Sequence, residues 1–125
     1  MPRLPESASL ARRLATHALA VWRLDLLAES AELVVTEFVA NAADHARGAL
    51  IRVTFTRLTP QRVRVAVIDM SRALPTRRVT SLEDIDGRGL ALVEALSAKW
   101  GTDRFGWGKR VWSELEALED ERNGT

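Results

Sequence analysis

Two segments near the start of the chain have the apolar spacing of amphipathic helices. The first is predicted to run from Ser7, which is placed to cap it, to about Trp22. Its expected buried positions are Leu10, Leu14, His17, Ala18 and Val21. The second is predicted from about Leu26 to His45 and ends at Arg47-Gly48. Its expected buried positions are Leu33, Val34, Phe38 and Ala42.

The pattern then changes to an alternation of apolar and polar residues, which predicts strands over residues 50–56 and 62–68. The turn residues Thr59-Pro60-Gln61 between them predict an antiparallel hairpin. Residues 70–86 have no periodicity and are expected to form a loop. A third helix is predicted from Leu90 to about Lys99, and a last strand from Lys109 to about Leu115. The third helix has Leu90, Val93, Leu96 and Ala98 as candidate core positions.

This order of elements predicts an α+β fold. The predicted hairpin excludes a purely parallel sheet, and the strands exclude a helical bundle. We therefore expect a two-layer α/β sandwich, with helices on one face of a small mixed or antiparallel sheet. The length of 125 residues fits one domain spanning residues 1–125, with a charged tail over 119–125 that is expected to fray.

Composition narrows the class of protein. Hydrophobic residues make up 46% of the chain and charged residues 28%, which is ordinary for a globular domain. A net charge of +1 gives no electrostatic case for nucleic-acid binding. The chain has no cysteine, no apolar run of membrane-spanning length and no apolar leader at its start. A soluble cytoplasmic protein that binds neither nucleic acid nor membrane is the expectation.

The second helix carries polar residues that are suited to a metal–nucleotide site. Glu37, Asn41 and His45 are four residues apart and therefore share one helical face. The amide oxygen of Asn41 is a hard donor for Mg²⁺, and the Glu37 carboxylate can orient water or accept a proton. Taken alone, however, the segment fits an ordinary amphipathic helix somewhat better.

Three further places carry candidate chemistry. Asp69 ends the second strand, where it could accept a hydrogen bond from a ligand amine, with Ser71 two residues later. Gly87 and Gly89 open the helix that begins at Leu90, and exposed N–H groups at such a position attract phosphate. Lys109 begins the last strand and could screen phosphate charge. Each place also has a purely structural interpretation. Asp69 could cap a turn, the two glycines could form a simple loop-to-helix turn, and Lys109 could be a solvated cation.

The order of these motifs is more specific than any one of them. The segment from Glu37 through Asn41 to His45 resembles the N-box of the GHKL superfamily, the histidine-kinase-like ATPases. Val67-Ile68-Asp69-Met70-Ser71 resembles the next box, Gly87-Arg88-Gly89-Leu90 the second glycine box, and residues 108–115 the closing strand. The short form of the chain is most similar to the anti-sigma-factor serine kinases of Gram-positive bacteria, and the resemblance covers roughly residues 5–115.

This resemblance implies a Bergerat-type fold that binds ATP and Mg²⁺. Asn41 would bind the metal and Glu37 would be the general base. Asp69 would recognise adenine, and Gly87, Gly89 and the helix they open would hold phosphate beneath a lid over residues 72–86. The implied activity is transfer of the ATP γ-phosphate to a serine of an antagonist protein. The implied partners are that antagonist, a sigma factor and, in some relatives, a second copy of the chain.

Two other functions stay open. Ser71 replaces the usual glycine of its box, and Arg110 stands where a small threonine is common. These two residues favour a non-catalytic module that binds ATP weakly or not at all and acts by docking a partner. The ATP-binding part of a histidine kinase ranks last, because both histidines fall within the ATP-binding segments and no phospho-accepting helix is found.

Overall fold

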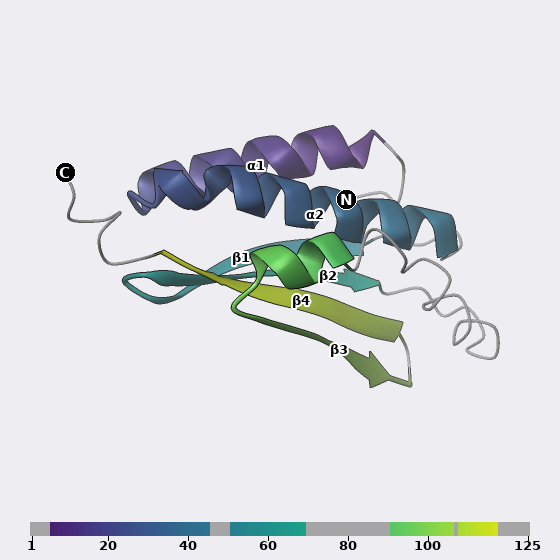
Figure 1. The fold of residues 1–125 in the computed structure, drawn as a ribbon. Helices are drawn as coiled ribbons and strands as arrows, with labels where there is room; N and C mark the ends of the chain where they lie inside the picture. Colours follow the sequence, from purple (N-terminus) through teal and green to yellow (C-terminus); the bar gives the residue numbers. More distant parts are fainter. Residues whose placement is uncertain (1–5, 46–50, 70–90, 107, 118–125) are drawn as a thin grey trace.

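Helices lie on one face of a small sheet in the computed structural model, which describes residues 6–45, 51–69, 91–106 and 108–117 (Figure 1). Helices α1 (Ser7–Val21) and α2 (Ala28–His45) are joined through a 3₁₀ turn, η1 (Asp25–Leu27). In the described residues the sheet has four strands in the order β1-β2-β4-β3, and each neighbouring pair is antiparallel. A short helix over residues 91–96 lies on the same face as α2. The predicted α+β two-layer sandwich is therefore confirmed.

The predicted hairpin is also confirmed, as strands β1 (Ile51–Thr59) and β2 (Arg62–Asp69). In its turn, the backbone N–H of Gln61 donates a hydrogen bond to Thr59 Oγ1 at 3.2 Å. Strand β2 then pairs with β4 (Gly108–Glu116), so β2 is interior to the sheet. This position explains why valine dominates β2, since β-branched side chains pack well on a sheet surface buried by helices.

The core lies between the sheet and the helices. Alternate residues of β2 and β4 face the helices, and α2 supplies the largest share of the opposing layer. Its fully or nearly fully buried residues include Val34, Val35, Phe38 and Val39. The expectation for α2 therefore holds for Val34, Phe38 and Ala42 but is wrong for Leu33, which is 40% exposed.

The predicted buried face of α1 is wrong except at Ala18, which is half-buried and packs against the core. Leu10, Leu14 and Val21 are 39%, 42% and 62% exposed, and His17 is exposed as well. The buried positions are instead small residues and a single leucine, namely Ser7, Ala11, Ala15 and Leu19. Alanines at a helix contact allow the backbones to approach closely, and α1 uses them against α2 and the sheet. Ser7 is the first buried residue of the helix and not its cap, since the N-cap position is Glu6.

The end of α1 is a Schellman motif. The N–H of Leu24 donates to the carbonyl of Leu19 at 2.8 Å, and the N–H of Arg23 donates to that of Ala20 at 3.0 Å. The motif needs a residue with a left-handed backbone just after the end of the helix, and Arg23 takes that conformation with φ 61°. Leu19 and Leu24 are both buried, which is the apolar contact that usually accompanies this motif.

The third helix ends earlier than predicted, and a strand that the pattern missed follows it. Helical structure stops at Leu96, and β3 (Lys99–Phe105) begins three residues later. Val93 is buried and Leu96 half-buried as expected, but Ala98 is exposed. The chain turns where Ser97 Oγ lies 2.6 Å from Val93 O and from Ser113 Oγ, and Ala98 N–H donates to Glu114 O.

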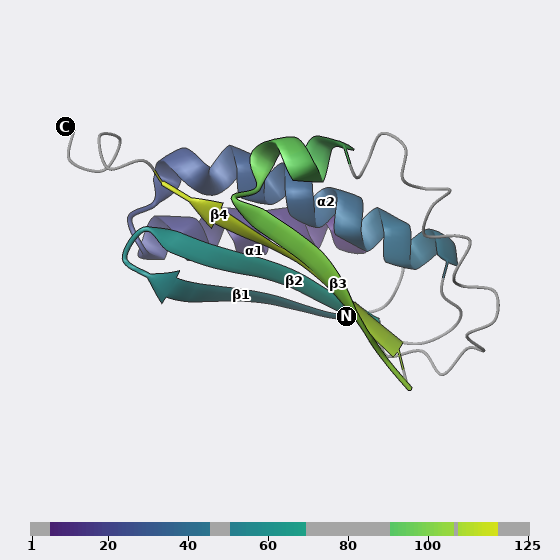
Figure 2. The same ribbon diagram turned by 60° about the horizontal axis from the view of Figure 1, so that its bottom comes forward.

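The pattern missed β3 because the strand has little apolar alternation. One of its faces carries Gly101, against which the Trp112 ring of β4 packs so closely that a Cβ there would lie 2.8 Å from the ring. This strand lies at one edge of the sheet and β1 lies at the other (Figure 2).

The second face of the sheet carries a network of charged side chains. The carboxylate of Glu114 accepts hydrogen bonds from Arg62 at 3.0 Å and from Arg64 at 2.6 Å, and Arg64 lies over the Trp112 ring. Glu114 is only 7% exposed. Burial raises the pKa of Glu114, but the hydrogen bonds and charges of Arg64 and Arg62 outweigh that effect, and its pKa is held below the ordinary value.

Candidate functional site

Three of the four segments that carry the candidate chemistry, α2, β2 and β4, meet at one end of the molecule. Helix α2 and strand β2 both run towards this end, and β4 starts there (Figure 1). The sheet register sets Asp69, the last residue of β2, directly opposite Lys109 at the start of β4. Motifs that are forty residues apart along the chain are thus brought together by the sheet.

Asn41 has the most informative environment of the predicted site residues. Its Oδ1 atom is buried and has no hydrogen-bond partner in the part of the chain that the structure describes. Leaving a buried carbonyl oxygen unpaired costs about 1–3 kcal/mol, so such an atom is usually explained by a ligand, ion or water. A lone amide oxygen is a suitable ligand for Mg²⁺, which takes few protein ligands together with phosphates and water. The residue therefore fits the predicted metal.

Glu37 lies one helical turn before Asn41, and both residues are partly exposed. Between them in sequence, Phe38 and Val39 are buried in the core. The helix thus fixes the position of the carboxylate relative to the amide through packing on its other side. Glu37 is only partly covered, so its carboxylate can meet a ligand or a hydroxyl group.

Asp69 and Lys109 lie on the face of the sheet that the helices cover. Strand alternation gives Asp69 the same side as buried Val65 and Val67, and gives Lys109 the same side as buried Val111. Asp69 is half-buried at the strand end. A carboxylate in this position can accept a hydrogen bond from a ligand amine, which is the chemistry expected of it.

Arg110 lies on the opposite face of the sheet. Its guanidinium donates a hydrogen bond from Nε to Asp103 Oδ2 at 3.0 Å, and the two residues are register partners on β4 and β3. The side chain therefore points away from the face that carries Asp69 and Lys109. Arg110 therefore no longer favours a module that binds ATP weakly or not at all.

Strand β3 contributes a cation that the sequence pattern did not indicate. Arg104 is the register partner of Lys109 and is exposed near the same end of the sheet. It was missed because β3 was missed. The turn signal Gly106-Trp107-Gly108 before a predicted strand could have found it, since such a turn suggests a hairpin with a preceding strand.

Several predicted site residues lie outside the described residues. These are Ser71, Gly87, Gly89 and Leu90, together with the predicted lid over 72–86. His45 ends α2, and its side chain is likewise outside the description. The roles predicted for these residues stay predictions.

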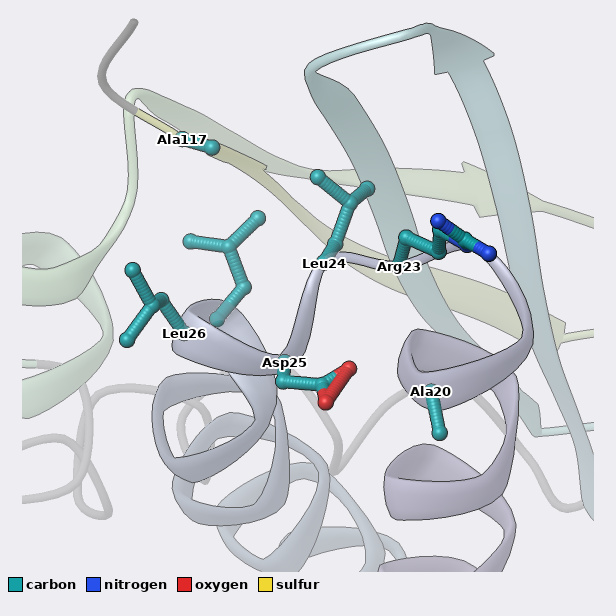
Figure 3. Close-up of a pocket in the computed structure, with 7 residues that line it drawn as sticks. Ala20, Arg23, Leu24, Asp25, Leu26 and Ala117 are labelled. Atoms are coloured by element: carbon teal, nitrogen blue, oxygen red, sulfur yellow. The ribbon is translucent and has the colours of Figure 1, made fainter. Parts of the chain in front are cut away.

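A pocket is found at the other end of the molecule, where α1 joins η1 (Figure 3). It has a volume of about 460 Å³ and is lined by residues 20, 23–27 and 117. Ala117 follows the last residue of β4, whereas Lys109 lies near its first, so the two places are separated by the length of the strand. The pocket contains none of the predicted site residues.

Comparison with known proteins shows which family the chain belongs to. Residues 1–112 match the family described as the histidine kinase-like ATPase domain, which covers most of the chain. The protein belongs to this family, and the GHKL superfamily is thereby confirmed. Membership places it among ATPase and kinase-like domains in general.

Two solved structures are similar to the chain, both from the Erythrobacter litoralis EL346 blue-light activated histidine kinase. Its histidine kinase domain aligns with a TM-score of 0.54 and 24% identity, over 77% of this chain and 46% of that one. A structure of the kinase itself aligns with a TM-score of 0.57 and 25% identity, over 79% and 33%. This chain therefore spans less than half of either. No curated protein matches it.

In the described residues, no helix is both long and apolar enough to cross a membrane.

Proposed function

We propose that this protein binds Mg-ATP and is a protein serine kinase of the anti-sigma-factor type. The observation that carries the proposal is the buried, unpartnered Oδ1 of Asn41 on the helix that bears Glu37. Family membership and the convergence of α2, β2 and β4 at one end support the nucleotide part. The serine-kinase part rests on the resemblance of the motifs and on the partly exposed Glu37.

Each residue has a role in the proposal. Asn41 holds Mg²⁺ through its amide oxygen, and Asp69 accepts a hydrogen bond from the adenine amine. Gly87, Gly89 and Leu90 hold phosphate, with Ser71 beside the base and Lys109 adding positive charge. When bound, Mg²⁺ neutralises charge on the phosphates.

The proposed reaction transfers the γ-phosphoryl group to a serine hydroxyl. Glu37 accepts the hydroxyl proton, a bond forms between the serine oxygen and the γ-phosphorus, and the bond from that phosphorus to the β–γ bridging oxygen breaks. The products are phosphoserine and ADP. Positioning supplies most of the rate in such a transfer, which suits a site built on a helix and two strand ends.

The proposed partners follow from the same resemblance. The phosphate acceptor is an antagonist protein, and a sigma factor is bound when the antagonist is phosphorylated. A homodimer is a further proposal, and the proposed location is the cytoplasm.

Transfer of labelled γ-phosphate from ATP to an antagonist-like protein encoded beside this gene tests the kinase. We expect transfer by the natural protein and a loss of at least about 100-fold in Glu37→Gln, with ATP affinity largely kept. Full transfer by Glu37→Gln would show that the assigned base is wrong. ATP binding without transfer to any such protein would remove the kinase and leave a nucleotide-binding module.

A further inference from the structure

The outward side of α2 carries a row of residues that leads into the candidate site. The row consists of Glu29, Leu33, Glu37 and Asn41, which are each four residues apart and therefore lie on successive turns of one helical face. Glu29 is exposed and Leu33 is 40% exposed, whereas Glu37 and Asn41 are partly exposed. We call Glu29, Leu33 and Glu37 the α2 stripe. It continues the candidate site outwards along the helix.

Helix α2 carries charge of one sign. It contains glutamates and an aspartate but no lysine or arginine. Glu32 is turned towards α1, where Thr16 donates a hydrogen bond to it. None of the ion pairs found within the described residues includes Glu29 or Glu37. The exposed carboxylate of Glu29 is therefore available to a cation of a partner.

The elements on either side of α2 do not change this balance. Helix α2 lies between α1 and the short helix over residues 91–96 (Figures 1 and 2). Arg12 of α1 donates to Thr36 and Arg13 donates within α1, and both line a groove to which no residue of the α2 stripe belongs. The short helix has Glu94 as its charged residue, and Glu94 is exposed. Charge complementarity thus favours a basic partner, and a second copy docked through the same stripe would bring like charges together.

The spacing of the stripe matches that of an extended chain. Residues four apart in a helix are separated by about 6 Å along its axis. In an extended segment, every second side chain points to the same side, and such side chains are about 6.6 Å apart. A segment that lies along α2 with a serine hydroxyl at Glu37 therefore brings the side chain two residues away to Leu33. It brings the side chain four residues away to Glu29.

We propose that the α2 stripe is the docking surface for the acceptor segment of the proposed phosphate transfer. The segment is extended and carries a serine, an apolar residue two positions away and a basic residue four positions away. The inference rests on the proposed function, because it takes Glu37 as the group that accepts the serine proton. Leu33 and Glu29 contact the acceptor and not the nucleotide, so they determine which serine is used and leave ATP binding unchanged.

Phosphate transfer to synthetic peptides tests the proposal. The probe has a single serine with leucine two residues and arginine four residues away, and it is made in both chain directions. A matched peptide carries glutamate in place of arginine. We expect the natural protein to have a KM on the order of tenfold higher for the glutamate peptide, with kcat largely kept, and added salt to reduce the difference.

Two pairs of variants locate the contacts. Glu29→Lys should reverse the preference between the two peptides without changing the KM for ATP, and Glu94→Lys, at another exposed helical glutamate, should keep the preference. Leu33→Ser should raise the KM for the arginine peptide several-fold. Leu10→Ser is its control, because Leu10 of α1 is 39% exposed and Leu33 is 40% exposed. Melting curves confirm that all four variants fold.

Two measurements separate failure of the docking surface from failure of the kinase. Equal KM values for the two peptides, or a preference that Glu29→Lys leaves unchanged, would overturn the docking surface while the kinase stands. NMR titration of the labelled full chain without ATP covers the other case. Shifts of residues 29–37 with the arginine peptide, but no phosphate transfer to any acceptor, would keep the docking surface and remove the kinase. The absence of such shifts at millimolar peptide would overturn the docking surface.

Discussion

Helices α1 and α2 pack side by side on the same sheet, yet they bury different kinds of residue. Helix α2 buries large side chains such as Val35 and Phe38, and the Oδ1 atom of Asn41 on the same helix is buried as well. Helix α1 buries a serine, two alanines and a single leucine, and it leaves two other leucines and a valine 39–62% exposed. The difference separates two tasks: α2 forms the core and the candidate site, whereas α1 packs closely against it and presents an apolar outer side.

The largest expected effect is at the centre of α2. Phe38→Ala removes a ring that is 2% exposed and leaves a cavity between helix and sheet. We expect it to lower the free energy of unfolding by about 3–5 kcal/mol, measured by urea denaturation. A loss below about 1 kcal/mol would mean that α2 is not the main support of the core.

The next effect concerns the close packing of α1. Ala15 is fully buried, so Ala15→Leu should force the helix outwards and cost about 1–3 kcal/mol. Ala20→Leu is the control, because Ala20 is exposed on the same helix and the change should stay within about 0.5 kcal/mol. Equal effects of the two substitutions would contradict the assignment of the alanine face as the packed one.

A smaller effect is expected on the face of the sheet that neither helix touches. The pKa of Glu114 is lowered in the folded protein, so the carboxylate contributes stability at neutral pH, and that contribution is lost as the pH falls below its ordinary value of 4.5. Unfolding at a series of pH values should show a weaker acid dependence in Glu114→Gln than in the natural protein. Glu94→Gln, at an exposed helical position, is the control, and an unchanged profile in Glu114→Gln would contradict the assignment.

Helices α1 and α2 also differ in how much of their structure the sequence could predict. The hairpin, α1, α2 and the fold class followed from periodicity, because strands and helices with one buried face impose it. The face of α1 could not be predicted by hydrophobicity, since close packing selected Ala11 and Ala15 over nearby leucines. Strand β3 carries Gly101 where the Trp112 ring of the neighbouring strand packs, and the need for a glycine there depends on a tertiary contact that the sequence does not show.

The sequence could predict which motifs form the candidate site, but it could not predict the burial and hydrogen bonding of their side chains. The order of Glu37, Asn41 and Asp69 indicated the superfamily, which the family match confirms. Sequence did not indicate that the Asn41 oxygen is buried without a partner, or that Arg110 turns to Asp103 on the far face. Both facts depend on which strands are neighbours and on what packs around the helix.

The most direct test of the proposed Mg-ATP site is to replace Asn41 by leucine, which has a similar shape but no amide oxygen. Affinity for ATP with and without Mg²⁺ is measured by titration calorimetry, and stability by urea denaturation. We expect the natural protein to bind ATP in a Mg²⁺-dependent manner, and Asn41→Leu to lose that dependence while keeping or gaining stability, because an unpaired buried oxygen is removed. Unchanged Mg²⁺-dependent binding by a folded Asn41→Leu protein would contradict the account.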